Sequence, residues 1–409
     1  MGDPSSLIES PSELAANEIS RGQEKETIQR SGKGSKKMKL TIKREEFSRL
    51  FQIAAVVAPQ RSPKPILQNV KLEAQADRVV MTATDTEVGV RLNVPEVEVK
   101  QSGSVVIPVS RLNMILRECN DDILILEGDE NKTKITGKTS RFELQGQNPD
   151  EFPEVVDFEE QDYYELKAGV LRELIRRTLF ATDTESSRYA LGGVLLEINE
   201  NTITAVGTDG RRLAKMEGPC KVIGKPQNNQ ATTIVPARAM QLIERILPDD
   251  EVMVKLAPRA NDLLVSVPNG VFYTRLVEGR YPKWRDVIPR RTNAIKIELP
   301  VGPMYSALRQ AAIVASEDSR GIDFIFKDGS LVLTNTTTEV GESRVEMPVA
   351  FDSGELIITL DHRFFADFLK VLPPESTFTL EVESPEQAAY CVTEDHYGYV
   401  IMPLSRDRR

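Results

Sequence analysis

The sequence predicts an α+β fold of three similar domains, each with two helices packed on antiparallel sheets. Its 409 residues suffice for about three domains of ordinary size, and a hydrophobic content of 40% can supply a core for each. A strand that runs into a helix through an Arg occurs three times, and the intervals between Arg111, Arg238 and Arg363 are 127 and 125 residues. Alternating strands joined by hairpin-length turns fill the remainder, and such turns join only antiparallel neighbours. We therefore expect two βαβββ-like halves in each domain.

Each repeat opens with a short strand that leads into an amphipathic helix. In the first repeat the strand begins at Met38, and the apolar residues Phe47, Leu50 and Phe51 then recur three and four positions apart. In the second repeat the opening strand spans residues 163–167. The complete set of predicted helices is 44–57, 110–119, 169–181, 237–247, 303–315 and 361–372.

Domain boundaries follow from the period and from local composition. Residues 148–155 are acidic, contain two prolines and lack periodicity, and residues 288–293 form a second break. We therefore place the three domains at 38–157, 162–289 and 294–409.

The first 37 residues differ in composition from the rest of the chain. They are rich in Ser, Glu, Gln, Asn and Gly, contain no aromatic residue, and end in a basic cluster at 33–37. This composition predicts a disordered extension. Because Met38 could serve as an alternative start, a cloned leader or a misassigned start is one explanation, and a basic arm that contacts nucleic acid is the other.

The composition indicates the cellular compartment of the protein and the oxidation state of its cysteines. No run of 18 apolar residues and no secretory leader occurs, so the sequence favours a cytoplasmic protein with no membrane segment. Cys119, Cys220 and Cys391 are scattered and lack C-x-x-C spacing, which indicates reduced structural thiols. We expect neither a metal site nor a cofactor.

Catalytic motifs are absent from the sequence. The two histidines, His362 and His396, are placed at a helix start and in a turn, where a solvated His is more common than a general base. The segment 218–225 resembles a phosphate loop only superficially, because five residues separate its glycines and no Ser or Thr follows the Lys. We therefore expect a protein that is not an enzyme.

Charge is distributed unevenly between the helices and the rest of the chain. The net charge is −10, yet the six predicted helices contain 12 Lys and Arg residues against 7 Asp and Glu residues. If the helices share one face of a curved array, that face is positive and the outer sheets are negative. Ordinary solvated helices also carry Arg, so this pattern alone leaves both interpretations open. The helix residues that are candidates for a positive lining are Arg111, Arg172, Arg176, Arg177, Arg238 and Arg245.

Seven motifs match one family in order. They are MKLTI at 38–42, KPIL at 64–67, TDTE at 84–87, RYALGG at 188–193, AVGTDGRRLA at 205–214, EGRYPKW at 278–284 and VIMPL at 400–404. Together they resemble the bacterial sliding clamp family, the β subunits of DNA polymerase III. The resemblance runs from Met38 to the C-terminal region without large gaps.

The resemblance implies a head-to-tail homodimer that closes into a six-domain ring, with helices inside and a continuous sheet outside. It implies that duplex DNA passes through the ring and is held by its phosphates without base recognition. Arg61 corresponds to a basic loop position of the family. By analogy the dimer interface contains Phe142, Leu144, Ile313 and Val314, although all four could instead be core residues.

The resemblance also implies a hydrophobic pocket for partner peptides between the second and third domains. The expected partners are the replicative polymerase α subunit, the clamp loader and other clamp-binding-motif proteins of replication and repair. Arg211 replaces a His that is common in the family, and the C-terminal end departs from the usual pattern, which leaves the peptide preference open. A diverged interaction scaffold with no DNA role is the alternative function. The matching pocket positions are Arg188, Leu191, Thr208, Gly210, Arg211, Arg212, Leu213, Pro282, Val287, Val400, Ile401, Met402, Pro403 and Leu404.

Overall fold

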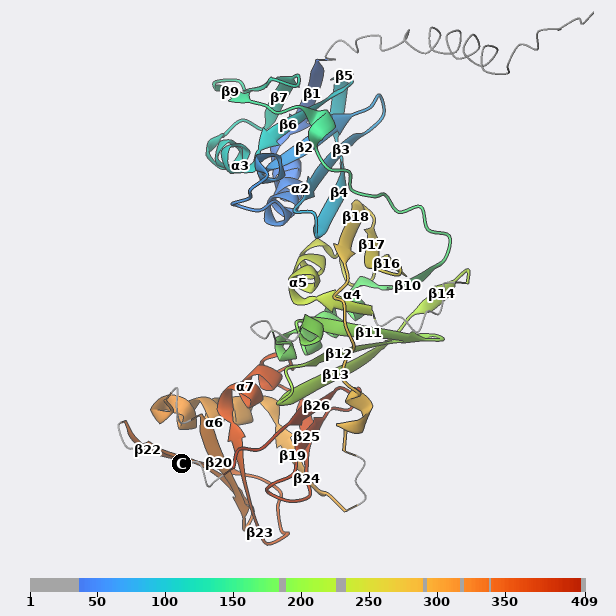
Figure 1. The fold of residues 1–409 in the computed structure, drawn as a ribbon. Helices are drawn as coiled ribbons and strands as arrows, with labels where there is room; N and C mark the ends of the chain where they lie inside the picture. Colours follow the sequence, from blue (N-terminus) through green and yellow to red (C-terminus); the bar gives the residue numbers. More distant parts are fainter. Residues whose placement is uncertain are drawn as a thin grey trace, which may run out of the picture.

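The computed structural model describes residues 37–183, 189–225, 233–289, 293–316, 320–337 and 340–405, with Tyr189 described by its backbone only. The predicted disordered extension therefore lies outside the described residues, apart from Lys37. Three domains follow one another in an arc, and helices α2, α3, α5, α6 and α7 lie on the side toward which the arc curves (Figure 1).

Domain 1 contains nine strands and two α-helices. Each helix follows directly on a strand, and two short 3-10 segments, η1 and η2, complete the domain. The elements are β1 (Met38–Lys43), α2 (Arg44–Val57), η1 (Pro65–Gln68), β2 (Asn69–Ala74), β3 (Val79–Thr84), β4 (Val88–Val94), β5 (Val97–Gln101), β6 (Gly103–Pro108), α3 (Val109–Glu118), β7 (Ile123–Gly128), β8 (Lys132–Thr136), β9 (Arg141–Gln145) and η2 (Pro149–Glu151).

Domain 2 repeats this order. Its elements are β10 (Tyr163–Lys167), α4 (Ala168–Thr178), η3 (Leu179–Ala181), η4 (Tyr189–Leu191), β11 (Gly193–Asn199), β12 (Thr202–Thr208), β13 (Arg212–Pro219), β14 (Lys221–Ile223), β15 (Thr233–Pro236), α5 (Ala237–Ile246), β16 (Met253–Pro258), β17 (Asp262–Val267), β18 (Gly270–Arg275) and η5 (Trp284–Asp286).

Domain 3 repeats it again, without a counterpart of β5 and β14 among its described residues. Its elements are β19 (Ile295–Pro300), α6 (Val301–Ala311), η6 (Ala312–Val314), β20 (Gly321–Lys327), β21 (Ser330–Thr337), β22 (Gly341–Pro348), β23 (Glu355–Asp361), α7 (His362–Lys370), β24 (Thr377–Val382), β25 (Ala389–Val392) and β26 (Gly398–Ile401).

The six predicted helices are confirmed, with starts within two residues of the predicted ones. Two of them, α4 and α6, end three and four residues earlier as α-helices than predicted, because their last turns tighten into η3 and η6. In α4 the residues Leu171, Leu174 and Ile175 are buried, as the apolar spacing requires. At α7 the side chain of Asp361 caps the first turn by accepting from the Arg363 backbone N–H at 2.9 Å.

The sheets run across the domain boundaries. Strand β4 of domain 1 pairs antiparallel with β18 of domain 2, and β13 of domain 2 pairs antiparallel with β26 of domain 3. These pairings create a nine-stranded and an eight-stranded sheet. Among the described residues, β9 ends the sheet of domain 1 and β22 ends the sheet of domain 3, each with one edge unpaired.

The buried apolar residues form two main clusters. Most buried apolar residues of domains 1 and 2 form one contiguous cluster. Most of those of domain 3 form a second one, which contains Phe324, Phe365 and Phe368 and includes Ala181 and Ala214 of domain 2. All three cysteines are buried and free, and burial raises the pKa of the Cys391 thiol. In the described part of the chain, no group of three or more His, Cys, Asp or Glu side chains could hold a metal ion, and no helix is long and apolar enough to cross a membrane.

Candidate functional site

The joint between domains 2 and 3 is built on the pairing of β13 with β26. Arg212 lies opposite Ile401 and Leu213 lies opposite Val400. Since side chains alternate between the two faces of a sheet, these two pairs point in opposite directions. Leu213 and Val400 join a small buried apolar cluster that also contains Leu195, Val206, Ile234, Tyr281 and Trp284.

A tight turn leads into β13. The Thr208 hydroxyl donates to the Arg212 carbonyl at 2.6 Å and accepts from the Gly210 N–H at 3.1 Å. The Asp209 carboxylate accepts from the backbone N–H groups of Arg211 and Arg212 at 2.9 and 3.0 Å. Gly210 has a φ of +88°, a conformation that glycine adopts without strain. The turn is therefore fixed by its own side chains.

The segment 281–287 lies over the same cluster. The Tyr281 hydroxyl donates to the Val206 carbonyl at 3.0 Å, and burial raises its pKa. The Trp284 indole N–H donates to Glu197 at 3.2 Å, and the Arg285 guanidinium lies 4.2 Å from the Trp284 ring centroid. These contacts hold the backbone that presents Val287.

Several predicted pocket residues near this joint have exposed apolar side chains. Val287, Met402 and Leu404 are 44%, 45% and 40% exposed, which is unusual for large apolar side chains. Pro282 and Arg211 are exposed as well, whereas Pro403 is partly buried. Leu191, Thr208, Leu213 and Val400 are buried. The exposed group can contact a partner, and the buried group supports it from below.

Two predicted pocket residues are corrected, and a third cannot be placed. Ile401 is fully buried in the domain 3 core on the opposite face of the sheet. The Arg212 side chain also turns to that face, where it donates to Asp209, Asp367 and the Phe180 carbonyl at 3.0, 2.9 and 2.7 Å. Its guanidinium is 4.4 Å from the ring centroid of Phe364. Neither side chain can line the predicted pocket, while Arg188 lies outside the described residues.

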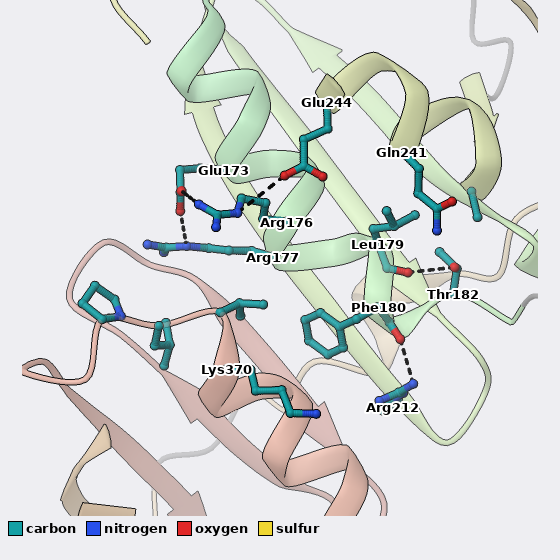
Figure 2. A pocket seen from close by; sticks show the side chains of 14 residues that line it. Glu173, Arg176, Arg177, Leu179, Phe180, Thr182, Arg212, Gln241, Glu244 and Lys370 are labelled. Atoms are coloured by element: carbon teal, nitrogen blue, oxygen red, sulfur yellow. Dashed lines mark hydrogen bonds and ion pairs between the residues drawn. The ribbon is translucent and has the colours of Figure 1, made fainter. Parts of the chain in front are cut away.

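The opposite face of the joint holds a cavity of about 790 Å³ between α4, α5 and α7 (Figure 2). Figure 2 shows Arg176, Arg177 and Arg212 directed toward carboxylate or carbonyl oxygens at its walls. Although burial alone would lower the pKa of Arg212, Tyr399 and Asp367 raise it, so this guanidinium stays charged. The cavity is lined by Glu173, Arg176, Arg177, Leu179, Phe180, Thr182, Arg212, Ala237, Gln241, Glu244, Lys370, Val371, Leu372 and Pro373.

The prediction that Arg177 belongs to a positive lining is also corrected. It is only 8% exposed, and its guanidinium donates to Glu173 at 2.8 Å and to Asp395 of domain 3. It also lies 5.3 Å from the Tyr397 ring centroid, and the Tyr397 hydroxyl donates to the Arg177 carbonyl at 2.8 Å. Arg177 joins two domains and is not available to a DNA phosphate.

The other predicted lining residues fall into two groups. Arg172, Arg176 and Arg238 are engaged with carboxylates: Arg172 with Asp250, Arg176 with Glu173 and Glu244, and Arg238 with Asp85 of domain 1. Arg61, Arg111 and Arg245 are exposed. Arg111 on α3 and Arg245 in the last turn of α5 lie on helices of the same side of the arc (Figure 1).

The predicted interface residues lie near the two unpaired sheet edges. Phe142 and Leu144 are in β9, partly buried against the core of domains 1 and 2. Ile313, in η6, is 76% exposed, the highest value among the exposed large apolar residues that the structure describes. Val314 is partly buried, and its carbonyl accepts from Thr337 at 2.9 Å.

Sequence reasoning missed the carboxylates that hold this region together. Asp367 and Asp395 of domain 3 pair with Arg212 and Arg177 across 155 and 218 residues of sequence. The spacing of Asp367 on its helix gives no signal for such a long-range pair. Asp209, by contrast, stands within the TDGRR motif and could have been assigned to the turn.

Comparisons with known proteins identify the same family over all three domains. Models for the N-terminal, central and C-terminal domains of the DNA polymerase III β subunit match residues 38–156, 165–283 and 285–405. The β sliding clamp of Chlamydia muridarum is 34% identical over 334 residues, covering 81% of this chain and 90% of the relative. That of Pseudomonas putida is 31% identical over 375 residues, covering 90% of this chain and all of the relative.

Solved structures give the same result. A crystal structure of a Pseudomonas aeruginosa sliding clamp, the β subunit of DNA polymerase III, bound to griselimycin superimposes with a TM-score of 0.83 at 26% identity, covering 91% of this chain and all of that one. A sliding clamp from Bacillus subtilis superimposes with a TM-score of 0.84 at 22% identity, covering 90% and 99%, which shows the shared fold.

Proposed function

Since the chain belongs to the bacterial β sliding clamp family, the β subunits of DNA polymerase III, we propose that it encircles duplex DNA as a head-to-tail homodimer and tethers the replicative polymerase to it. The mechanism is topological: a closed ring prevents dissociation without binding any base, and no reaction is catalysed. This role places the protein in the cytoplasm, with no cofactor.

The observation that carries the proposal is that both joints inside the chain are built alike. At the first joint the Arg275 N–H donates to the Glu87 carbonyl at 2.9 Å, and at the second the Met402 N–H donates to the Arg211 carbonyl at 2.9 Å. Two further joints of the same kind, one at each place where the two chains meet, close two such arcs into a ring of six domains.

A second pair of equivalent bonds lies beside the two joints, one within domain 2 and one within domain 3. The Val277 N–H donates to the Ile234 carbonyl at 2.8 Å, and the Leu404 N–H donates to the Thr359 carbonyl at 2.9 Å. A repeated joint gives each domain nearly the same rotation relative to the last, and that constant rotation is what a ring requires.

The helix side of the arc is then the inner wall of the ring. We propose that Arg61, Arg111 and Arg245 approach phosphates, because they are exposed, and that Arg176 and Arg238 contribute when phosphate competes with their carboxylates. Such contacts are weak and sensitive to salt, so they permit sliding. They fix no register on the duplex, because phosphates carry no sequence information.

The apolar surface at the joint of domains 2 and 3 is the proposed partner site. Val287, Met402 and Leu404 can accept the apolar anchors of a short peptide, and a flexible Met adapts to anchors of different shape. The exposed Arg211 stands at the edge of this surface and can orient a polar or acidic group of the peptide. The expected partners are the polymerase α subunit, a clamp loader and other clamp-binding-motif proteins.

A scaffold without a DNA role is the second candidate. It is favoured by the pairing of Arg172, Arg176 and Arg238 with carboxylates, which reduces the positive charge available to phosphates. This candidate shares the apolar partner surface but requires no ring.

A topological experiment separates the two functions. The protein is loaded onto a nicked circular duplex by a clamp loader, and half of the sample is then cut to a linear form. A sliding ring stays on the circle and leaves the linear DNA within minutes. Equal retention on both forms, or none on either, would refute the encircling mechanism.

A further inference from the structure

The joint between domains 1 and 2 contains a cavity of about 690 Å³ that has no role in the proposed function. It lies where the start of α5 meets the paired strands β4 and β18 (Figure 1). Val88 and Ala239 on its walls are buried, and Leu276 and Val277 add partly buried apolar side chains. Its volume is in the range of cavities that bind small organic molecules in an apolar interior.

The equivalent place at the joint of domains 2 and 3 is filled by the chain itself. Arg212 corresponds to Val88, since each is the first residue of its strand in the pairing across the joint. Phe364 corresponds to Ala239, since each is the third residue of its helix. The Arg212 guanidinium lies 4.4 Å from the Phe364 ring centroid. The cavity therefore lies where a long side chain and an aromatic ring lie at the second joint.

The charged group of that stack has a replacement at the first joint. Asp209 and Asp85 hold equivalent turns, because each accepts from two backbone N–H groups with one carboxylate oxygen. The other oxygen accepts from Arg212 at the second joint and from Arg238 at the first. Arg238 also lines the cavity. Since Arg238 satisfies Asp85, a ligand in the cavity needs no charge of its own, and the missing group is the ring.

We propose that this cavity binds a small uncharged aromatic compound. The ring of the ligand takes the place that the Phe364 ring has at the second joint, and it packs on Val88 and Ala239. The guanidinium of Arg238 supplies a flat cationic group against which the ring stacks. This contact is of the same kind as the one that Arg212 makes with Phe364.

The charges at the rim of the cavity also favour an uncharged ligand. Arg275 and Glu87 lie 3.6 Å apart, with side chains 60% and 64% exposed, so these two charges balance each other. Glu278 is an exposed lining residue and repels a carboxylate. A cationic ligand is repelled in turn by Arg238. An uncharged ring avoids both repulsions.

A methyl-resolved NMR titration of the full-length chain with naphthol tests the site. Saturable shifts should appear at the methyl groups of Val88, Ala239 and Val277, with a dissociation constant below about 1 mM. The methyl groups of Val287 and Leu404, on the proposed peptide surface, should keep their positions. Shifts centred on those two residues, or no saturable shift at the cavity, would overturn the proposal.

Two matched compounds test the class of ligand. Decahydronaphthol keeps the skeleton of naphthol without its aromatic rings, and naphthoate adds a negative charge. Each should bind about five-fold more weakly than naphthol, because one loses the stacking on a guanidinium and the other meets an acidic rim. Equal affinity of the saturated alcohol would overturn the aromatic class, and equal affinity of naphthoate would overturn the uncharged class.

Filling the cavity should remove the binding. Ala239→Phe restores the ring that α7 has at the equivalent position, and Leu276→Trp fills the cavity from the segment after β18. Each should weaken naphthol binding about ten-fold or more, because the ring loses its space. Val156→Phe is the control, since Val156 is 42% exposed and lies outside the cavity, and it should keep the wild-type affinity.

Circular dichroism checks the folding of each variant, because Ala239 is fully buried. Leu276→Trp changes a partly buried side chain and gives an independent result. Wild-type affinity in either folded cavity variant would overturn the proposal. All residues of the site belong to one chain, so failure of the ring on circular DNA would leave the naphthol result unchanged.

Discussion

The two joints inside the chain share a backbone pattern but differ in what holds them. At the joint of domains 1 and 2, the apolar cores are contiguous, and in the ion pair of Arg238 with Asp85 the Arg side chain is 54% exposed and the Asp side chain 11% exposed. At the joint of domains 2 and 3, Arg177 and Arg212 are 10% and 11% exposed in their side chains and each pairs with an Asp of domain 3. Apolar contact is non-directional, whereas buried ion pairs fix orientation.

One pair of equivalent positions illustrates this difference. Arg212, opposite Ile401, stacks on Phe364, the third residue of α7. At the first joint the corresponding residues are Val88, opposite Thr274, and Ala239, the third residue of α5. These two smaller residues help to line a cavity of about 690 Å³. The comparison shows that the joint carrying the proposed partner surface contains ion pairs of buried Arg side chains, whereas the Arg side chain in the ion pair of its counterpart is exposed.

The largest expected effect is from Arg212→Ala. This change leaves Asp209 and Asp367 without their shared partner in a largely buried site, so it should lower the stability of the joint by about 3 kcal/mol. Urea unfolding followed by the fluorescence of Trp284, which lies at this joint, measures the loss. Arg259→Ala is the matched control, because Arg259 also pairs with two carboxylates but its side chain is 34% exposed, against 11% for Arg212. Equal losses in the two variants would contradict a special role for Arg212.

The next effect concerns the partner surface on the same joint. Val287→Asp places a charge on an apolar surface and should weaken binding of a clamp-binding peptide by about ten-fold. Fluorescence anisotropy with a labelled peptide measures the affinity. Val156→Asp serves as the control, since Val156 is 42% exposed in the linker between domains 1 and 2 and should leave binding unchanged. If both variants bind equally well, the peptide site lies elsewhere.

A smaller effect is expected at the first joint. Arg238→Ala removes an exposed ion pair with Asp85 and should cost about 0.5 kcal/mol. Thermal unfolding at low and high salt measures it, and the difference from wild type should shrink as salt rises. A loss as large as that of Arg212→Ala would remove the distinction between the joints.

The smallest effect is a pH dependence at the second joint. Burial raises the pKa of Asp395, but hydrogen bonds from Thr393 and Arg177 outweigh it and leave the pKa below its ordinary value. A carboxyl group with a lowered folded-state pKa stabilises the protein above its unfolded pKa of about 4, and this contribution is lost as pH falls through the folded-state value. Unfolding midpoints between pH 6 and pH 3 should fall less steeply in Asp395→Asn. Parallel curves would contradict the role of Asp395.

The sequence predicted the repeating fold more accurately than it predicted the contacts of individual charged side chains. Helices such as 44–57 were predictable because apolar residues three and four apart must share a buried face. Arg177 and Arg212 were misassigned because Arg on a helix or strand end is usually solvated, and their partners are 218 and 155 residues away. Leu213 and Ile401 lie on strands that meet across domains, so only the observed register shows that they face opposite ways.

Hydrogen exchange at the two joints tests this account most directly. In Arg212→Ala, the amides that pair β13 with β26 should exchange at least ten-fold faster than in wild type, because the joint opens more often. In Arg238→Ala, the amides that pair β4 with β18 should keep their wild-type rates within about three-fold. Similar acceleration at both joints, or none at β13 and β26, would contradict the claim that buried ion pairs hold the second joint.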